Sequence, residues 1–237
     1  MLLPVTHHGV WMSAVGGGAV LGYMGHDDWQ DMSDYLVHLT DGESWFKIIY
    51  ERTLRATTAQ GTARSVVGLG TTQHAICLSE IPLGLLGRLA DRHGQFGVGF
   101  KRDFVRSRGG APVWYLARGT KHQVSFQALM NEKMRGGAEP DDPLWVLTPF
   151  VDNPGSGAGW SYEFEWEREW RVAGGLSFTL DDVQFLLIPE VIQEDWRDHW
   201  KTVFGAQTVF AGAMIDAGWD VARLQAELKR AGLNDAS

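Results

Sequence analysis

The chain is poor in cysteine, in basic charge and in long apolar runs. Its 237 residues include one cysteine, Cys77, which excludes a disulfide framework and a cysteine-based zinc site and favours an intracellular, reducing location. Lys and Arg number 21 against 29 Asp and Glu, giving a net charge of −8. This balance argues against non-specific nucleic-acid binding through a broad basic surface. The remaining composition, 44% hydrophobic and 21% charged, is that of an ordinary globular protein.

An uncharged stretch at residues 9–25 resembles a signal or membrane segment at first sight. No Lys or Arg precedes it, glycines interrupt it, and it is too short to span a bilayer comfortably. We therefore expect residues 1–33 to form a glycine-rich extension packed on one domain of residues 34–237, in a cytoplasmic protein without a membrane partner. Residues 16–18 complete neither GxGxxG nor a P-loop pattern, which leaves a phosphate-cradling loop as the weaker alternative.

Strand and helix patterns alternate along residues 34–237, which indicates an α+β fold. Period-two patterns predict the strands, and apolar residues at helical spacing predict the helices. The expected strands cover residues 34–40, 75–79, 96–104, 112–117, 162–172 and 183–188. The expected helices begin at Asp41 or Gly42, run from Pro82 to about His93 and from 221 to 231, and fill an insertion near residues 120–150. A turn at residues 107–110 joins the third and fourth strands, and residues 153–159 form a loop.

The segment 162–172 (YEFEWEREWRV) carries the most information about function. As one extended strand it would place its aromatic residues on one face and four glutamates, at 163, 165, 167 and 169, on the other. Same-face neighbours in a strand lie about 6.8 Å apart, so these carboxylates would repel one another. Water offsets that repulsion if the face is exposed, whereas a cation, an arginine or a polar substrate offsets it in a cleft. Both interpretations remain open, and Arg171 at the end of the row favours an organised site.

The histidines and the nucleophiles give weaker indications. His7 and His8 are adjacent and no HExxH motif occurs, so a catalytic zinc site is not expected. His38 and Thr40 share one face of an apolar strand, where a buried core histidine is the simpler interpretation. Cys77 has no basic neighbours in sequence and is interpreted as an inert core thiol. Ser79 lacks a GxSxG context, which argues against a serine hydrolase, and His93 near a helix end is explained by the helix dipole.

The order of five segments is more specific than any single residue. A His-x-Thr strand is followed by CLSEIPL at 77–83, HGQFGVGFK at 93–101, PVWY at 112–115 and EREWR at 167–171. This series resembles the AbiGi-type abortive-infection proteins of bacteria over roughly residues 34–190. The chain departs from the pattern at Leu89 and His93, where such proteins often carry a histidine and a tyrosine. The resemblance therefore assigns no role to either position.

The AbiGi-type pattern is similar in turn to the ADP-ribosyltransferase fold, including DarT-like enzymes. That similarity implies a split β-sheet core with flanking helices and NAD as the substrate. By the same similarity His38 and Thr40 would contact NAD together with Ser79, and Arg55 would pair with the NAD phosphates. Glu169, or Glu167, would be catalytic, because a carboxylate in a water-poor cleft stabilises the positive charge that develops as nicotinamide leaves.

Three functions follow as hypotheses. The first is an NAD-dependent ADP-ribosyltransferase acting in phage defence, as a toxin or within a toxin–antitoxin pair, on a nucleic-acid or protein acceptor. The second is a non-catalytic antitoxin that keeps the fold and binds a partner protein or a nucleotide through its acidic face. The third is a nuclease or hydrolase that uses the carboxylates with a divalent ion. The basic run Lys101, Arg102, Arg106 and Arg108 is interpreted either as a nucleic-acid rim or as a solvated loop.

Overall fold

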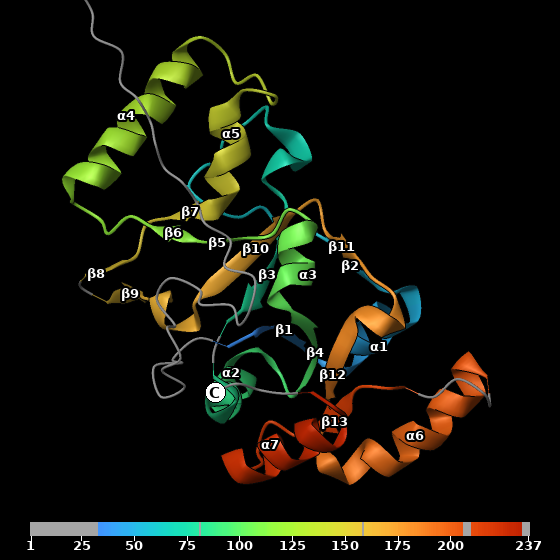
Figure 1. Ribbon diagram of the computed structural model, residues 1–237. Helices are drawn as coiled ribbons and strands as arrows, with labels where there is room; N and C mark the ends of the chain where they lie inside the picture. The colour runs from blue at the N-terminus through green and yellow to red at the C-terminus, as the bar shows by residue number, and fades with distance from the viewer. Residues whose placement is uncertain (1–32, 81, 158, 206–209, 234–237) are drawn as a thin grey trace, which may run out of the picture.

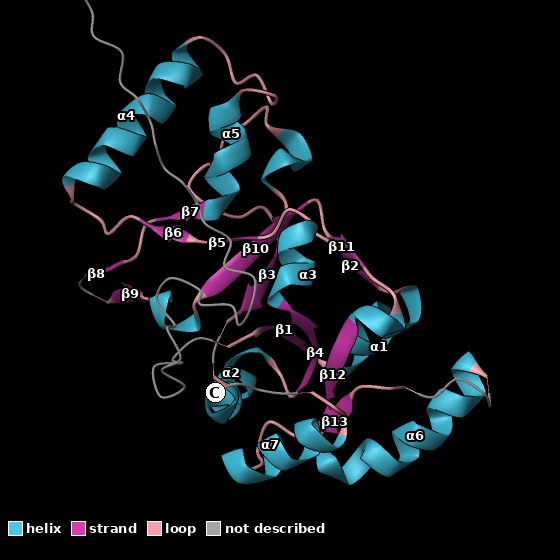
Figure 2. Cartoon of the chain, viewed as in Figure 1, coloured by secondary structure: helices cyan, strands magenta, loops and turns pink. Residues whose placement is uncertain are grey.

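A seven-stranded mixed sheet forms the centre of the molecule (Figures 1 and 2). The computed structural model describes residues 33–80, 82–157, 159–205 and 210–233, so the expected extension of residues 1–33 lies outside it apart from Ser33. The strand order is β13-β12-β4-β1-β3-β10-β5, and every neighbouring pair is antiparallel except β12 and β13. The strands are β1 (Tyr35–Thr40), β3 (Ala75–Ser79), β4 (Phe96–Lys101), β5 (Ala111–Pro112), β10 (Glu169–Ala173), β12 (Val183–Leu187) and β13 (Ala213–Ile215).

Seven α-helices and three short strand pairs complete the described part of the chain. The helices are α1 (Gly42–Glu51), α2 (Leu86–His93), α3 (Arg102–Ser107), α4 (Lys121–Arg135), α5 (Pro143–Leu147), α6 (Glu190–Phe204) and α7 (Val221–Arg230). The short pairs are β2 (Thr53–Leu54) with β11 (Leu176–Ser177), β6 (Trp114–Tyr115) with β7 (Val151–Asp152), and β8 (Gly155–Gly157) with β9 (Trp160–Tyr162). Single 3₁₀ turns include η3 (Leu83–Leu85), η4 (Thr148–Phe150) and η5 (Glu165–Glu167).

Helices cover both faces of the sheet because its central strands are apolar on both sides. On β1, Leu36 packs in one buried cluster with Trp45 of α1. Tyr35 and Val37, which point to the opposite face, belong to a second cluster with Leu86 of α2. This alternation within one strand follows the period of two that a β-strand imposes. The α+β class expected from the sequence is confirmed.

The helices α4 and α5 lie at the end of the molecule opposite α6 and α7 (Figure 1). They pack around a small cluster of their own, made of Ala63, Leu69, Met130 and Trp145. In α4 only Met130 is buried. This outlying unit occupies the region near residues 120–150 in which the sequence predicted a helical insertion.

Local patterns predicted several elements correctly, and the start of α1 shows why. Asp41 has an extended backbone, and its Oδ1 accepts a hydrogen bond from the Ser44 backbone N–H at 2.9 Å. Such a cap satisfies one of the orphan N–H groups of the first helical turn. The strands β1, β3 and β12 and the helix α7 are likewise confirmed, with boundaries within two residues of those expected.

Several expected elements differ from those in the structure. The strand predicted over 96–104 ends at Lys101, and residues 102–107 form α3 instead. No hairpin joins residues 96–104 to 112–117, because β4 pairs with β1 and β12 while β5 pairs with β10. Residues 153–159 are not simply a loop, since Gly155–Gly157 pairs with Trp160–Tyr162 as a small hairpin. The helix α6 was not anticipated from the sequence.

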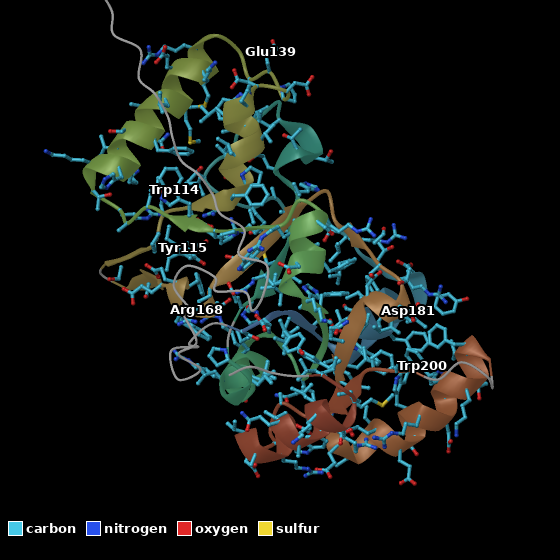
Figure 3. All side chains as sticks on the ribbon, in the orientation of Figure 1. Trp114, Tyr115, Glu139, Arg168, Asp181 and Trp200 are labelled. Carbon is cyan, nitrogen blue, oxygen red and sulfur yellow. The ribbon has the colours of Figure 1, made fainter. Side chains whose placement is uncertain are left out.

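The largest correction concerns the segment 162–172, which is not one strand. The strand β9 ends at Tyr162, residues 165–167 form the 3₁₀ turn η5, and Arg168 adopts a left-handed backbone with φ of 45° before β10 begins. Figure 3 shows Arg168 at this bend. The four glutamates therefore do not form a single row: Glu163 and Glu165 are exposed, whereas Glu167 is buried.

Candidate functional site

Three neighbouring strands bring the predicted site residues together. The register pairs Val37 of β1 with Ser79 of β3, and Ser79 with Glu169 of β10. Adjacent strands lie about 4.8 Å apart, so the backbones of β1 and β10 are separated by about 10 Å across β3. His38 and Glu169 are thus two strands apart although they are distant in sequence.

A cavity of about 120 Å³ opens at this point of the sheet. Four of its lining residues were predicted from the sequence: His38, Ser79, Glu167 and Glu169. The full lining is Val37, His38, Leu39, Cys77, Ser79, His93, Glu167 and Glu169. The cavity therefore combines two imidazoles, two carboxylates, a hydroxyl and a thiol within an otherwise apolar wall.

A second cavity of about 360 Å³ lies beside the first and shares His38 with it. Thr40 and Arg55, the two remaining predicted site residues, line this second cavity. Arg55 is largely exposed and its Nε donates to Glu51 Oε2 at 2.8 Å. Pockets that hold small ligands have volumes of roughly 300–1,000 Å³, so the second cavity alone reaches that range. The structure thus divides the predicted residues between two adjoining cavities.

His38 lies where β1 and β3 lose their pairing. The two strands are paired through Val37 and Ser79, and beyond this pair the Nδ1 of His38 donates to the Cys77 carbonyl oxygen at 2.9 Å. Burial lowers the pKa of His38, a hydrogen bond to the Cys77 carbonyl partly opposes that shift, and His93 lowers the pKa further. The imidazole is therefore neutral at pH 7, and because Nδ1 carries the proton, Nε2 is a hydrogen-bond acceptor.

Arg171 holds Glu169 through two hydrogen bonds. Its Nε donates to Oε1 and its Nη2 to Oε2, both at 2.9 Å. The guanidinium is buried, with only 1% of the residue exposed. This bidentate geometry fixes the plane of the Glu169 carboxylate. In the sequence, Arg171 at the end of the acidic row favoured an organised site, and the structure places it in contact with Glu169.

Glu167 reaches the same cavity from the turn η5, where two residues of α2 meet it. His93 Nε2 lies 3.2 Å from Glu167 Oε1, and Arg92 Nε lies 3.3 Å from the same oxygen. Rings of the turn also pack under α2, with the Arg92 guanidinium 4.2 Å from the Phe164 ring centre and the Arg88 guanidinium 4.0 Å from that of Trp166. These contacts hold the turn in place and aim Glu167 at the cavity.

His93 is the residue of the cavity that sequence reasoning missed. Its place near the end of α2 was explained by the helix dipole alone, and the family pattern carries a different residue there. The only available indication was its position immediately before the glycine-rich strand β4. A single sequence does not show which distant carboxylate a helix terminus will face.

The thiol of Cys77 borders the cavity but is not activated. Burial raises the pKa of Cys77, and the neighbouring Glu169 carboxylate raises it further, with Arg171 acting in the opposite direction. A thiol in this state is protonated at neutral pH and is a poor nucleophile. The residue is only partly buried, so it lines the cavity and does not belong to the deep core.

Metal binding and a basic rim receive no support from the described residues. Within them no group of three or more His, Cys, Asp or Glu side chains is placed to hold a metal ion. Three residues of the basic run make local contacts: Arg102 pairs with Glu80 and Asp34, Arg106 pairs with Asp103, and the Arg108 guanidinium lies 5.3 Å from the Phe104 ring centre. None of the helices in the described ranges is long and apolar enough to cross a membrane.

Comparison with known proteins gives one match. A family model described as "Putative abortive phage resistance protein AbiGi, antitoxin" matches residues 49–199. The matched segment contains Arg55, Ser79, Glu167 and Glu169 but begins after His38 and Thr40. No curated protein and no solved structure matches the chain.

Proposed function

The chain belongs to the AbiGi family of abortive phage resistance proteins, and we propose that it acts in phage defence as an NAD-dependent ADP-ribosyltransferase on a macromolecular acceptor. The observation that carries the proposal is that His38 and Glu169 line one cavity, two strands apart. The proposed reaction needs these two groups at one cavity. In the strand order β1-β3-β10 a single strand separates the strands that carry them.

Each residue has a definite part in the proposed reaction. The bond between nicotinamide and the ribose C1′ breaks, its electron pair leaves with nicotinamide, and positive charge develops on the ribose. Glu169, held in one orientation by Arg171, stabilises that charge. A nucleophile of the acceptor forms the new bond to C1′ and gives its proton to Glu167.

The substrate would lie across both cavities. The smaller one suits only part of a dinucleotide, and the larger one, with Thr40 and Arg55, suits the remainder. The lone pair on His38 Nε2 would accept a hydrogen bond from a hydroxyl group of the ligand, such as those of a ribose. His38 lines both cavities and would contact the ligand where it passes from one to the other.

Nicotinamide release from NAD by the purified chain tests the proposal. We expect Glu169→Gln to lower the rate at least about 100-fold, since one such electrostatic contact is typically worth a factor of 10²–10³. Glu163→Gln is the matched control, because Glu163 is exposed in the same segment and lines neither cavity. Equal rates for wild type and Glu169→Gln, or no release with water, nucleic acid or protein as acceptor, would refute the proposal.

A second function, a non-catalytic antitoxin, is favoured by a different observation. Both cavity glutamates are engaged in ion pairs, Glu167 with Arg92 and Glu169 with Arg171, as structural carboxylates are. The description of the AbiGi family also contains the word antitoxin, which favours a cognate toxin as partner. In that case the exposed Glu163 and Glu165 would meet a basic partner surface.

The two functions separate in binding experiments. An antitoxin should bind the product of a neighbouring gene equally well with Glu169→Gln, and lose that binding when Glu163 and Glu165 are both replaced by lysine. Thermal shifts add a further distinction: NAD should stabilise a transferase, whereas magnesium or manganese should stabilise a metal-dependent hydrolase.

A further inference from the structure

Asp152 does not line the cavity, but it contacts the same arginine as Glu169, Arg171. Its Oδ2 accepts a hydrogen bond from Arg171 Nη2 at 2.8 Å, the same nitrogen that donates to Glu169 Oε2 at 2.9 Å. Asp152 is 3% exposed and Arg171 is 1% exposed. One buried guanidinium is therefore shared between two carboxylates, of which only Glu169 lines the cavity.

Further contacts fix Asp152 in this position. Tyr162 donates its hydroxyl to Asp152 Oδ2 at 2.8 Å, and Arg64 Nη1 lies 3.4 Å from Oδ1. Burial alone would raise the pKa of Asp152, but the hydrogen bonds and charge of Arg171, with help from Tyr162 and Arg64, bring the pKa below its usual value. Asp152 is thus ionised at neutral pH and competes with Glu169 for Arg171.

The backbone around Asp152 makes this arrangement rigid. Asp152 ends β7, which follows η4, and the Pro149 carbonyl of η4 accepts Arg171 Nη1 at 2.6 Å. The Asp152 carbonyl accepts the Leu116 backbone N–H at 2.8 Å. Figure 2 shows β7 next to β6, between β10 and the outlying helices α4 and α5. The carboxylate therefore comes from a segment outside the seven-stranded sheet whose strands carry the cavity.

We propose that Asp152 is a positioning residue of the Glu169 site. Through Arg171 it turns the Glu169 carboxylate toward the cavity and prevents the guanidinium from neutralising that carboxylate fully. Without Asp152 the guanidinium would pair with Glu169 alone, and the negative charge available to a cationic sugar in the cavity would fall. The catalytic part of this inference rests on the proposed transferase function.

Kinetics test the catalytic part. We expect Asp152→Asn, which keeps the shape but removes the charge, to lower kcat for nicotinamide release about tenfold while KM for NAD changes less than twofold. Asp152→Glu restores the charge and should recover most of kcat. Tyr162→Phe removes a hydrogen bond from Asp152 without changing any charge at pH 7, and it should leave kcat near that of wild type.

The single thiol gives a readout that needs no NAD turnover. Cys77 borders the cavity, and the charges of Glu169 and Arg171 both act on it. Removal of the Asp152 charge leaves more positive potential at the thiol, so methyl methanethiosulfonate should label Asp152→Asn at pH 8.5 about fivefold faster than wild type. Asp152→Glu and Tyr162→Phe should be labelled at the wild-type rate. Mass spectrometry follows the reaction, and the melting temperature of each variant reports loosening of the fold.

The outcomes distinguish the two proposals. Equal labelling of all four proteins, or labelling of Asp152→Glu as fast as Asp152→Asn, overturns the role of Asp152 whatever the activity. Equal loss of kcat in Asp152→Asn and Tyr162→Phe would overturn it too, because that pattern follows stability rather than charge. If Asp152→Asn is the only protein labelled faster and the wild-type protein releases no nicotinamide, the charge effect is supported and the transferase function is refuted.

Discussion

His93 and Glu167 both line the cavity and contact each other, with Nε2 of the imidazole 3.2 Å from Oε1 of the carboxylate. His93 is the last residue of α2 and Glu167 is the last residue of η5, so the contact joins a helix to a turn that is distant from it in sequence. Glu167 is nearly buried, whereas His93 is about one-third exposed. The contact therefore fixes the buried partner more than the exposed one.

Replacing His93 should destabilise the fold modestly. We expect His93→Ala to lower the free energy of unfolding by about 1 kcal/mol, because a mostly buried carboxylate loses the hydrogen bond to one of the two side chains of α2 that contact it. Urea titration at pH 6.5 measures the change. His122→Ala serves as the control, since His122 is exposed on α4 and should change stability by less than about 0.5 kcal/mol. The same loss in both variants would contradict the structural role of the pair.

Much of the fold follows from local sequence. The alternation in residues 35–40 and the Asp41 cap predict β1 and α1, because both depend on neighbours in the chain. The strand predicted over residues 162–172 is wrong for the opposite reason. Its alternating aromatic and acidic residues are typical of a strand, yet Phe164 and Trp166 pack against Arg92 and Arg88 of α2. Those tertiary contacts bend the chain at η5, and no local pattern encodes them.

The candidate site, too, could be predicted from the sequence only in part. His38 and Glu169 could be named from sequence as chemically suitable, but their proximity depends on β3 lying between their strands. The sequence shows neither the strand order nor the register that pairs Ser79 with Glu169. Two further residues, His93 and Asp152, contact Glu167 and Arg171 from a helix end and from a two-residue strand, and neither was predicted.

His38 should make stability depend on pH below about 6.5. Its pKa in the folded chain is lowered by burial and by His93, although the Cys77 carbonyl partly opposes the shift. As the pH falls below the usual histidine value of 6.5, the unfolded chain binds a proton that folded His38 does not bind. The free energy of unfolding should then decrease by up to about 1.4 kcal/mol per pH unit until the folded pKa is reached.

A variant without the imidazole isolates this effect. In urea titrations from pH 7.5 to 5, His38→Gln should lose stability less steeply than wild type, because the remaining titratable groups are common to both proteins. Parallel curves for the two proteins would show that His38 titrates equally in the folded and unfolded chains.

The centre of the sheet should not accept a methyl group at Gly99. A Cβ built there would lie 2.3 Å from Cζ of Phe185, and Phe185 is fully buried with its ring packed edge-on against Tyr35 at 5.5 Å between ring centres. Gly99→Ala must therefore displace a ring that has no room to move, at a cost of about 1–3 kcal/mol. Gly136→Ala is the control, because the nearest heavy atom to its Cβ is 3.5 Å away and its φ of −83° suits any residue.

Adding Phe185→Leu to Gly99→Ala should give a double variant more stable than the sum of the two single losses predicts, since the smaller side chain makes room for the methyl group. Strict additivity would mean that the two positions are not in contact, and that the register of β4 against β12 differs from the one described.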